Sequence, residues 1–258
     1  MIDRRLFVAG ATGMAIAPAL AAEPPALGVL ELRQYTLQGG TRAAFTRLFE
    51  QQFVTSQDEV GCHVRAVFRD LDDPDRFVWI RGFTDMASRK MALETFYFGP
   101  VWQAHRAEAN AMMIDSDNVL LLKPLLGEIG PRTLGGRHLV RIAIHRLRGV
   151  DPAAFATFFA QRMMPAIEAA GGRAVATLTT ETAANTFPRL PVREGDPVFL
   201  WIAPFADQAA ERAFSGKLNA TSGWRDGIAD GLLPALMQKP EVLRLVPSIT
   251  VADAWEKG

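Results

Sequence analysis

The sequence is poor in the features that would identify its chemistry at once. It has a single cysteine, Cys62, so no disulfide can form within the chain, and this thiol is expected to be buried rather than to act as a nucleophile. Its 28 basic and 28 acidic residues balance, so charge gives no reason to expect nucleic acid or an anionic membrane surface as a partner. Beyond the first residues no apolar run is long enough for a transmembrane helix.

The first residues have the pattern of an export signal. Arg4 and Arg5 precede a short stretch of small and apolar residues that ends in Ala-Leu-Ala, a suitable cleavage site. The paired arginines predict a signal of the twin-arginine type over residues 1–22. General secretion stays open, because Asp3 stands where such signals more often carry Ser or Thr. The mature protein is therefore expected in the periplasm or outside the cell, without membrane contact after cleavage.

The rest of the chain consists of two sequence repeats. Large residues recur at one constant spacing, as the pairs Trp79 and Trp201, Phe83 and Phe205, Asp85 and Asp207, and Trp102 and Trp224. Two copies of one small unit usually fuse into a single body with an internal interface, where ligands tend to bind. We predict a first repeat over 23–125, a glycine-rich linker over 126–137 and a second repeat over 138–258.

Each repeat is predicted to run strand, helix, strand, strand, helix, strand. Alternation of apolar and polar residues, with turn residues between, places the strands of the first repeat at 29–37, 62–70, 76–83 and 119–123. Those of the second repeat are expected at 138–147, 173–180, 198–203 and 242–246. Pro100 should interrupt the second helical stretch of the first repeat. This order is that of the ferredoxin-like unit, an antiparallel sheet with both helices on one face.

The bare face of each sheet indicates how the repeats combine. Two sheets can bury these faces against each other, which gives a barrel with helices outside and a cavity within. We therefore predict an α+β fold in which tandem ferredoxin-like βαββαβ repeats close a dimeric-α/β-barrel-type domain within one chain, a pseudo-dimer. Two sheets packed in separate homodimers would also satisfy the pattern, and a homo-oligomer is expected.

Four short motifs give the chain a family resemblance. They are segments 31–37 (ELRQYTL), 68–83, 99–106 (GPVWQAHR) and 185–195 (NTFPRLPVREG). Together they resemble the NIPSNAP family over nearly the whole mature chain. The resemblance implies a dimeric α/β barrel, usually with two such units, and bacterial members mostly without an assigned activity; it carries over no catalytic residues. Related barrel families include cofactor-independent monooxygenases, haem-dependent enzymes and small stress-response proteins, so kinship does not choose a chemistry.

Alternation along the strands predicts which side chains line the cavity. If Leu30, Leu32, Val78 and Ile80 face the helices, a polar and aromatic set faces the barrel interior. This set is Glu31, Arg33, Tyr35, Trp79 and Arg81, with Arg141 and Trp201 in the places of Arg33 and Trp79 in the second repeat. Two interpretations stay open. Either an ion-pair network fills the barrel, or surplus arginines form a cationic pocket with aromatic walls for a small anionic or aromatic molecule.

Three classes of function remain compatible with this pattern. In an enzyme of the barrel-monooxygenase type, Tyr35, His63 and His145 are the candidate catalytic residues. A non-catalytic binding protein would need the pocket but no titrating group, and an interaction module would use only its outer helices. No metal site and no cofactor is predicted, and haem stays open.

The two repeats differ most in one connection. The second repeat inserts residues 182–196 where the first has a tight turn. Its two prolines, Pro188 and Pro191, and its bulky apolar residues predict an ordered flap that covers a barrel mouth or seals a subunit contact, using Asn185, Phe187 and Arg189.

Overall fold

The computed structural model describes residues 26–134, 139–221, 224 and 235–248, and the expected export signal lies outside them. The first repeat has the strands β1 (Val29–Leu37), β2 (His63–Asp70), β3 (Arg76–Phe83) and β4 (Met113–Leu126). Between β1 and β2 lie α1 (Arg42–Leu48), the π-helical turn η1 (Phe49–Phe53) and α2 (Val54–Asp58). Between β3 and β4 lie α3 (Met86–Phe98) and α4 (Pro100–Met112). The helical stretch breaks at Pro100, as predicted.

The second repeat runs in the same order after the short helix α5 (Pro131–Leu134). Its strands are β5 (Leu139–Arg146), β6 (Ala176–Thr180), β7 (Val198–Phe205) and β8 (Glu241–Pro247). Its helices are α6 (Pro152–Phe158), the π-helical turn η2 (Phe159–Met163), α7 (Met164–Ala169) and α8 (Gln208–Ala220). The two aspartates of the repeated pattern both cap a helix N-terminus. Asp85 accepts a hydrogen bond from the Ser88 backbone N–H at 2.7 Å, and Asp207 accepts one from the Ala210 backbone N–H at 2.8 Å. None of the described helices is long and apolar enough to cross a membrane.

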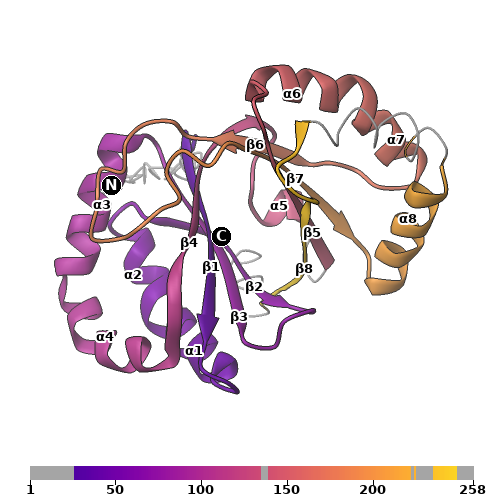
Figure 1. The fold of residues 1–258 in the computed structure, drawn as a ribbon. Coiled ribbons are helices and arrows are strands. Elements are labelled where there is room, and N and C mark those ends of the chain that lie inside the picture. Colours follow the sequence, from indigo (N-terminus) through magenta and orange to yellow (C-terminus); the bar gives the residue numbers. More distant parts are fainter. Residues whose placement is uncertain (1–25, 135–138, 222–223, 225–234, 249–258) are drawn as a thin grey trace, which may run out of the picture.

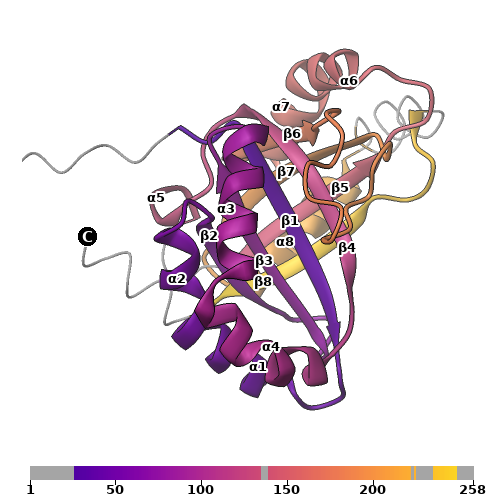
Figure 2. The ribbon, with the colours of Figure 1, turned by 90° about the vertical axis from the view of Figure 1, so that its left-hand side faces the viewer.

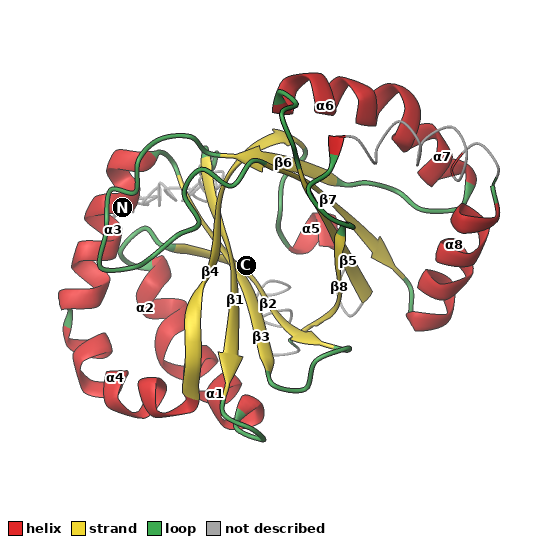
Figure 3. Cartoon of the chain, viewed as in Figure 1, coloured by secondary structure: helices red, strands yellow, loops and turns green. Residues whose placement is uncertain are grey.

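The two sheets join into one closed barrel. The strands follow each other in the order β1-β3-β2-β8-β5-β7-β6-β4. Antiparallel pairing of β2 with β8 and of β4 with β6 connects the sheets of the two repeats. Helices α1 to α4 cover one flank and α6 to α8 the opposite flank, with the strands between them (Figure 1, Figure 3). The predicted fold, two ferredoxin-like repeats in one barrel, is confirmed, and the sheets bury each other within one chain.

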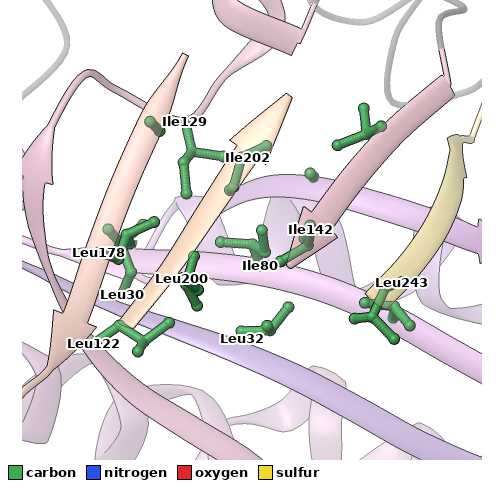
Figure 4. Close-up of a cluster of buried hydrophobic side chains, with 14 of the residues drawn as sticks. Leu30, Leu32, Ile80, Leu122, Ile129, Ile142, Leu178, Leu200, Ile202 and Leu243 are labelled. Atoms are coloured by element: carbon green, nitrogen blue, oxygen red, sulfur yellow. The ribbon is translucent and has the colours of Figure 1, made fainter. Parts of the chain in front are cut away.

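The barrel interior is an aliphatic core. Leu32 and Ile80 of the first sheet meet Ile142, Leu200 and Leu243 of the second in one cluster of buried side chains (Figure 4). The predicted assignment of faces was therefore wrong, since Leu30, Leu32, Val78 and Ile80 point into the barrel and not toward the helices. Alternation with period two separates two faces of a strand but does not say which face meets the helices.

Candidate functional site

The polar and aromatic set of the first repeat lies between its sheet and its helices. Antiparallel pairing of β1 with β3 places Glu31 opposite Arg81 and Arg33 opposite Trp79. The ring centroids of Trp79 and Phe49 of η1 are 4.6 Å apart, so this face of the sheet packs on the first helical stretch. The side chains that were predicted to line a cavity inside the barrel therefore lie in this layer outside it.

Glu31 receives three arginines at once. Its Oε2 accepts hydrogen bonds from Arg33 Nη1 at 2.7 Å and from Arg81 Nε at 2.8 Å. Its Oε1 accepts from Arg89 Nε of α3 at 2.7 Å. The side chains of all four residues are 0% exposed. We call Glu31, Arg33, Arg81 and Arg89 the charge cluster; it carries three positive charges and one negative charge.

The charge cluster keeps its carboxylate ionised. Burial by itself raises the pKa of Glu31, but the nearby guanidinium groups of Arg81, Arg33 and Arg89 hold that pKa far below its usual range. Among the described residues, the further side-chain acceptors of the cluster are neutral. Gln57 Oε1 accepts from Arg81 Nη1 at 2.8 Å and the Tyr35 hydroxyl from Arg33 Nε at 2.8 Å, while Asn185 Oδ1 and the Thr186 hydroxyl accept from Arg89 Nη1 at 3.0 and 3.3 Å. The ion-pair network thus exists, but outside the barrel and with positive charge in excess, which is costly for buried groups.

A cavity of about 330 Å³ lies in the same layer. Its walls are largely aromatic and include Tyr35, Phe49, Trp79, Tyr97, Trp102 and Phe187. Arg106 of α4 and Arg189, both exposed, add positive charge at its open side, and no carboxylate is found among the described lining residues. We call this cavity the first-repeat pocket.

The predicted flap closes this pocket from the second repeat. The loop, residues 181–197, lies beside α3 (orange in Figures 1 and 2). Asn185 Oδ1 accepts a hydrogen bond from Arg89 Nη1 at 3.0 Å, and Phe187 stacks on Tyr97 with ring centroids 5.8 Å apart. The Arg189 guanidinium lies 5.2 Å from the centre of the Phe98 ring. The flap therefore covers a pocket between sheet and helices and not a barrel mouth, and it ties the two repeats together at the charge cluster.

The second repeat does not repeat this site. Pairing of β5 with β7 places Arg141 opposite Ala203 and Ala143 opposite Trp201. Arg141 therefore takes the position that Glu31 has in the first repeat. The predicted equivalence of Arg141 with Arg33 was wrong by two residues along the strand. Arg141 pairs with Glu211 of α8. Arg141 and Trp201 lie in the other layer of helices, away from the first-repeat pocket.

Only Tyr35 of the three catalytic candidates lines the first-repeat pocket. His145 is buried among Phe155, Phe199 and Trp201, and its Nε2 accepts a hydrogen bond from Trp201 Nε1 at 3.1 Å. Burial, aided by Arg141, lowers the pKa of His145 to about 4, so the imidazole is neutral. His63 begins β2 outside the pocket lining, and burial together with Arg65 lowers its pKa.

Cys62 is fully buried, as predicted, and burial raises the pKa of its thiol to about 11. Arg89, in contrast, was missed. It lies on a helix, where strand alternation gives no information, and its one signal is its place four residues after the capping Asp85, where Glu211 follows Asp207.

The fold belongs to the class of dimeric α/β barrels, as solved structures show. A proposed monooxygenase of Lactobacillus acidophilus has a TM-score of 0.52 at 13% identity, covering 86% of this chain and 94% of that one. A proposed monooxygenase of Fusobacterium nucleatum has a TM-score of 0.55 at 8% identity, covering 86% and 93%. An anthrone oxidase-like protein has a TM-score of 0.58 at 12% identity, covering 89% of this chain and 94% of that one. At such low identity the likeness shows the fold alone.

The sequence of the first repeat matches a known family. Residues 30–126 match the NIPSNAP family model, from β1 to the end of β4. The first repeat thus matches the NIPSNAP family, which confirms the resemblance there. The match stops before the second repeat and the flap motif at 185–195, to which the resemblance was also expected to extend. None of the curated proteins matches the sequence.

Proposed function

We propose that the protein binds a small organic molecule with an aromatic or apolar body and an acidic group. The binding site is the first-repeat pocket beneath the flap. The observation that carries this proposal is the charge cluster, in which three buried arginines share one carboxylate beside an aromatic cavity. An anion in that cavity would offset the excess positive charge, which the protein itself leaves unbalanced.

The size and the walls of the pocket support the same ligand class. A cavity of 330 Å³ is at the small end of ligand sites, which span roughly 300–1,000 Å³. Aromatic walls such as Trp79 and Tyr97 favour a flat apolar body, because offset or edge-on ring pairs add about 0.5–1.5 kcal/mol beyond area burial. The exposed Arg106 and Arg189 contribute less, since a solvent-exposed ion pair is worth about 0–1 kcal/mol.

A small-molecule enzyme resembling the barrel monooxygenases is the second candidate. One observation favours this candidate: Tyr35, a candidate catalytic residue, lines the pocket. Two of the structural neighbours are named as proposed monooxygenases. Oxygen uptake measured with an electrode in the presence of a bound aromatic ligand would separate this activity from binding alone. Uptake that Tyr35→Phe abolishes would support catalysis.

Binding can be tested with two matched tryptophan substitutions on α4. Asn110 lines the pocket, whereas Glu108 on the same helix does not, and both are exposed. Aryl carboxylates, screened by thermal shift and then by calorimetry, should stabilise the wild type and the Glu108→Trp variant. Asn110→Trp should abolish this response, because the indole would fill the open side of the cavity. Equal responses of the two variants would place the ligand elsewhere and refute the proposal.

A further inference from the structure

The hydroxyl group of Tyr35 is held so that its proton is available for donation to a ligand. Its oxygen accepts a hydrogen bond from Arg33 Nε at 2.8 Å. A guanidinium has no acceptor, so the phenolic proton cannot return to Arg33. Within the described part of the chain no other hydrogen bond involves this hydroxyl. The proton therefore has no protein partner there, while Tyr35 lines the first-repeat pocket.

The ring of Tyr35 is fixed by its neighbours. Its centroid lies 6.2 Å from Phe45, 6.2 Å from Phe77 and 6.1 Å from Trp79, so the side chain cannot easily swing to another partner. Donors are also in surplus around it. Arg33 Nη2 and Trp79 Nε1 are buried, and neither has a hydrogen-bond partner among the residues that the structure describes. A ligand that meets this end of the pocket has to bring an acceptor.

We propose that Tyr35 selects the ligand, by donating its hydroxyl proton to a carboxylate or another anionic oxygen at the inner end of the pocket. This inference rests on the proposed function and names the residue and the ligand group that determine it. Arg33, which binds the Tyr35 oxygen, belongs to a cluster with surplus positive charge, so an anionic acceptor is favoured over a neutral one. Tyr35 is the contact and Arg33 its positioning residue.

The alternative is recognition of the acid at the open side of the pocket. Arg106 and Arg189 are exposed there, and charges in contact with water are screened and pay for the ordering of long side chains. A buried hydrogen bond to a charged group contributes more than such a pair. The acidic group of the ligand therefore lies at the inner end of the pocket, and its apolar body lies toward the open side, against the ring of Phe187.

The test compares an acid with its ester in three forms of the full chain. The affinities of 2-naphthoate and of methyl 2-naphthoate are measured by calorimetry at pH 7.5 for the wild type, Tyr35→Phe and Arg106→Gln. Tyr35→Phe keeps the ring and removes the proton, and should weaken 2-naphthoate at least tenfold while changing the ester less than twofold. Unchanged ester binding also shows that the pocket is still folded. Arg106→Gln should weaken the acid less than threefold.

The outcomes separate this inference from the proposed function. Binding of 2-naphthoate to Tyr35→Phe as tightly as to the wild type would overturn the role of Tyr35 and leave binding in the pocket standing. A larger loss of 2-naphthoate affinity in Arg106→Gln than in Tyr35→Phe would place the acidic group of the ligand at the open side. That result would also overturn the role of Tyr35. If neither probe nor any other aryl carboxylate binds the wild type, both proposals fail.

Discussion

Glu31 and Arg141 occupy the same position in the two repeats and carry opposite charges. Glu31 lies opposite Arg81 across β1 and β3, as Arg141 lies opposite Ala203 across β5 and β7. Each pairs with a residue four positions after a helix-capping aspartate, Arg89 in the first repeat and Glu211 in the second. The duplicated unit has thus kept an ion pair at this position with its charges exchanged.

The two ion pairs differ in what surrounds them. In the first repeat Arg33 and Arg81 add two further charges, whereas Ala143 and Ala203 stand at the equivalent positions of the second. The excess charge, and with it the proposed ligand site, therefore belongs to the first repeat alone.

Removing the acid of each pair should have unequal effects on stability. Glu31→Gln leaves three fully buried guanidinium groups without a counter-charge and should lower the free energy of unfolding by about 3–5 kcal/mol, as is usual for a broken buried pair. Glu211→Gln should cost less, because its partners Arg141 and Arg244 are 15% and 30% exposed and keep part of their hydration. Urea unfolding of both variants measures the difference. Equal losses would contradict the assignment of an excess charge to the first repeat.

His145 should make stability depend on pH. Its pKa is about 4 in the folded protein and ordinary when unfolded, so the unfolded chain binds more protons between these values. Stability is then fully present above the unfolded pKa and is lost as pH falls toward 4, by roughly 3 kcal/mol over the whole interval.

The measurement is a difference between two proteins, because Asp58 acts in the opposite direction. Burial raises the pKa of Asp58 to about 6, so its protonation favours the folded state as the pH falls through that region. Denaturant unfolding between pH 4.5 and 7.5 should show that His145→Phe loses less stability on acidification than the wild type. Parallel pH profiles would show that His145 does not titrate as its burial requires.

The flap should be needed for tight binding. Phe187 is 5% exposed and covers Tyr97, so Phe187→Ala opens the pocket to water and should weaken an aryl carboxylate at least tenfold. It should lower the free energy of unfolding by about 3 kcal/mol or more, since the ring is lost from a packed cluster. Thr182→Ala, an exposed change in the same loop, is the control and should alter neither quantity. Calorimetry that finds equal affinities for the two variants would make the flap a structural connection only.

Much of the fold could be predicted from local signals. The repeated Trp79 and Trp201, the capping Asp85 and Asp207 and the break at Pro100 gave the order of the elements. Ferredoxin-like repeats leave one sheet face bare, and this requirement predicted the closed barrel. Of the charge cluster, Glu31, Arg33 and Arg81 could be found because they share one face of two neighbouring strands.

Which residues share a face of a strand could be predicted from the sequence, because the alternation of side chains along a strand is a local property of the backbone. The tertiary structure alone decided which face meets the other sheet. Leu32, Ile80 and Leu200 pack in an apolar interior and need no polar partners, whereas Glu31 needs Arg89 from a helix distant in sequence. Which face meets the other sheet therefore depends on partners that the strand itself does not contain. A buried charge is tolerated only where another element supplies its counter-charge and hydrogen bonds.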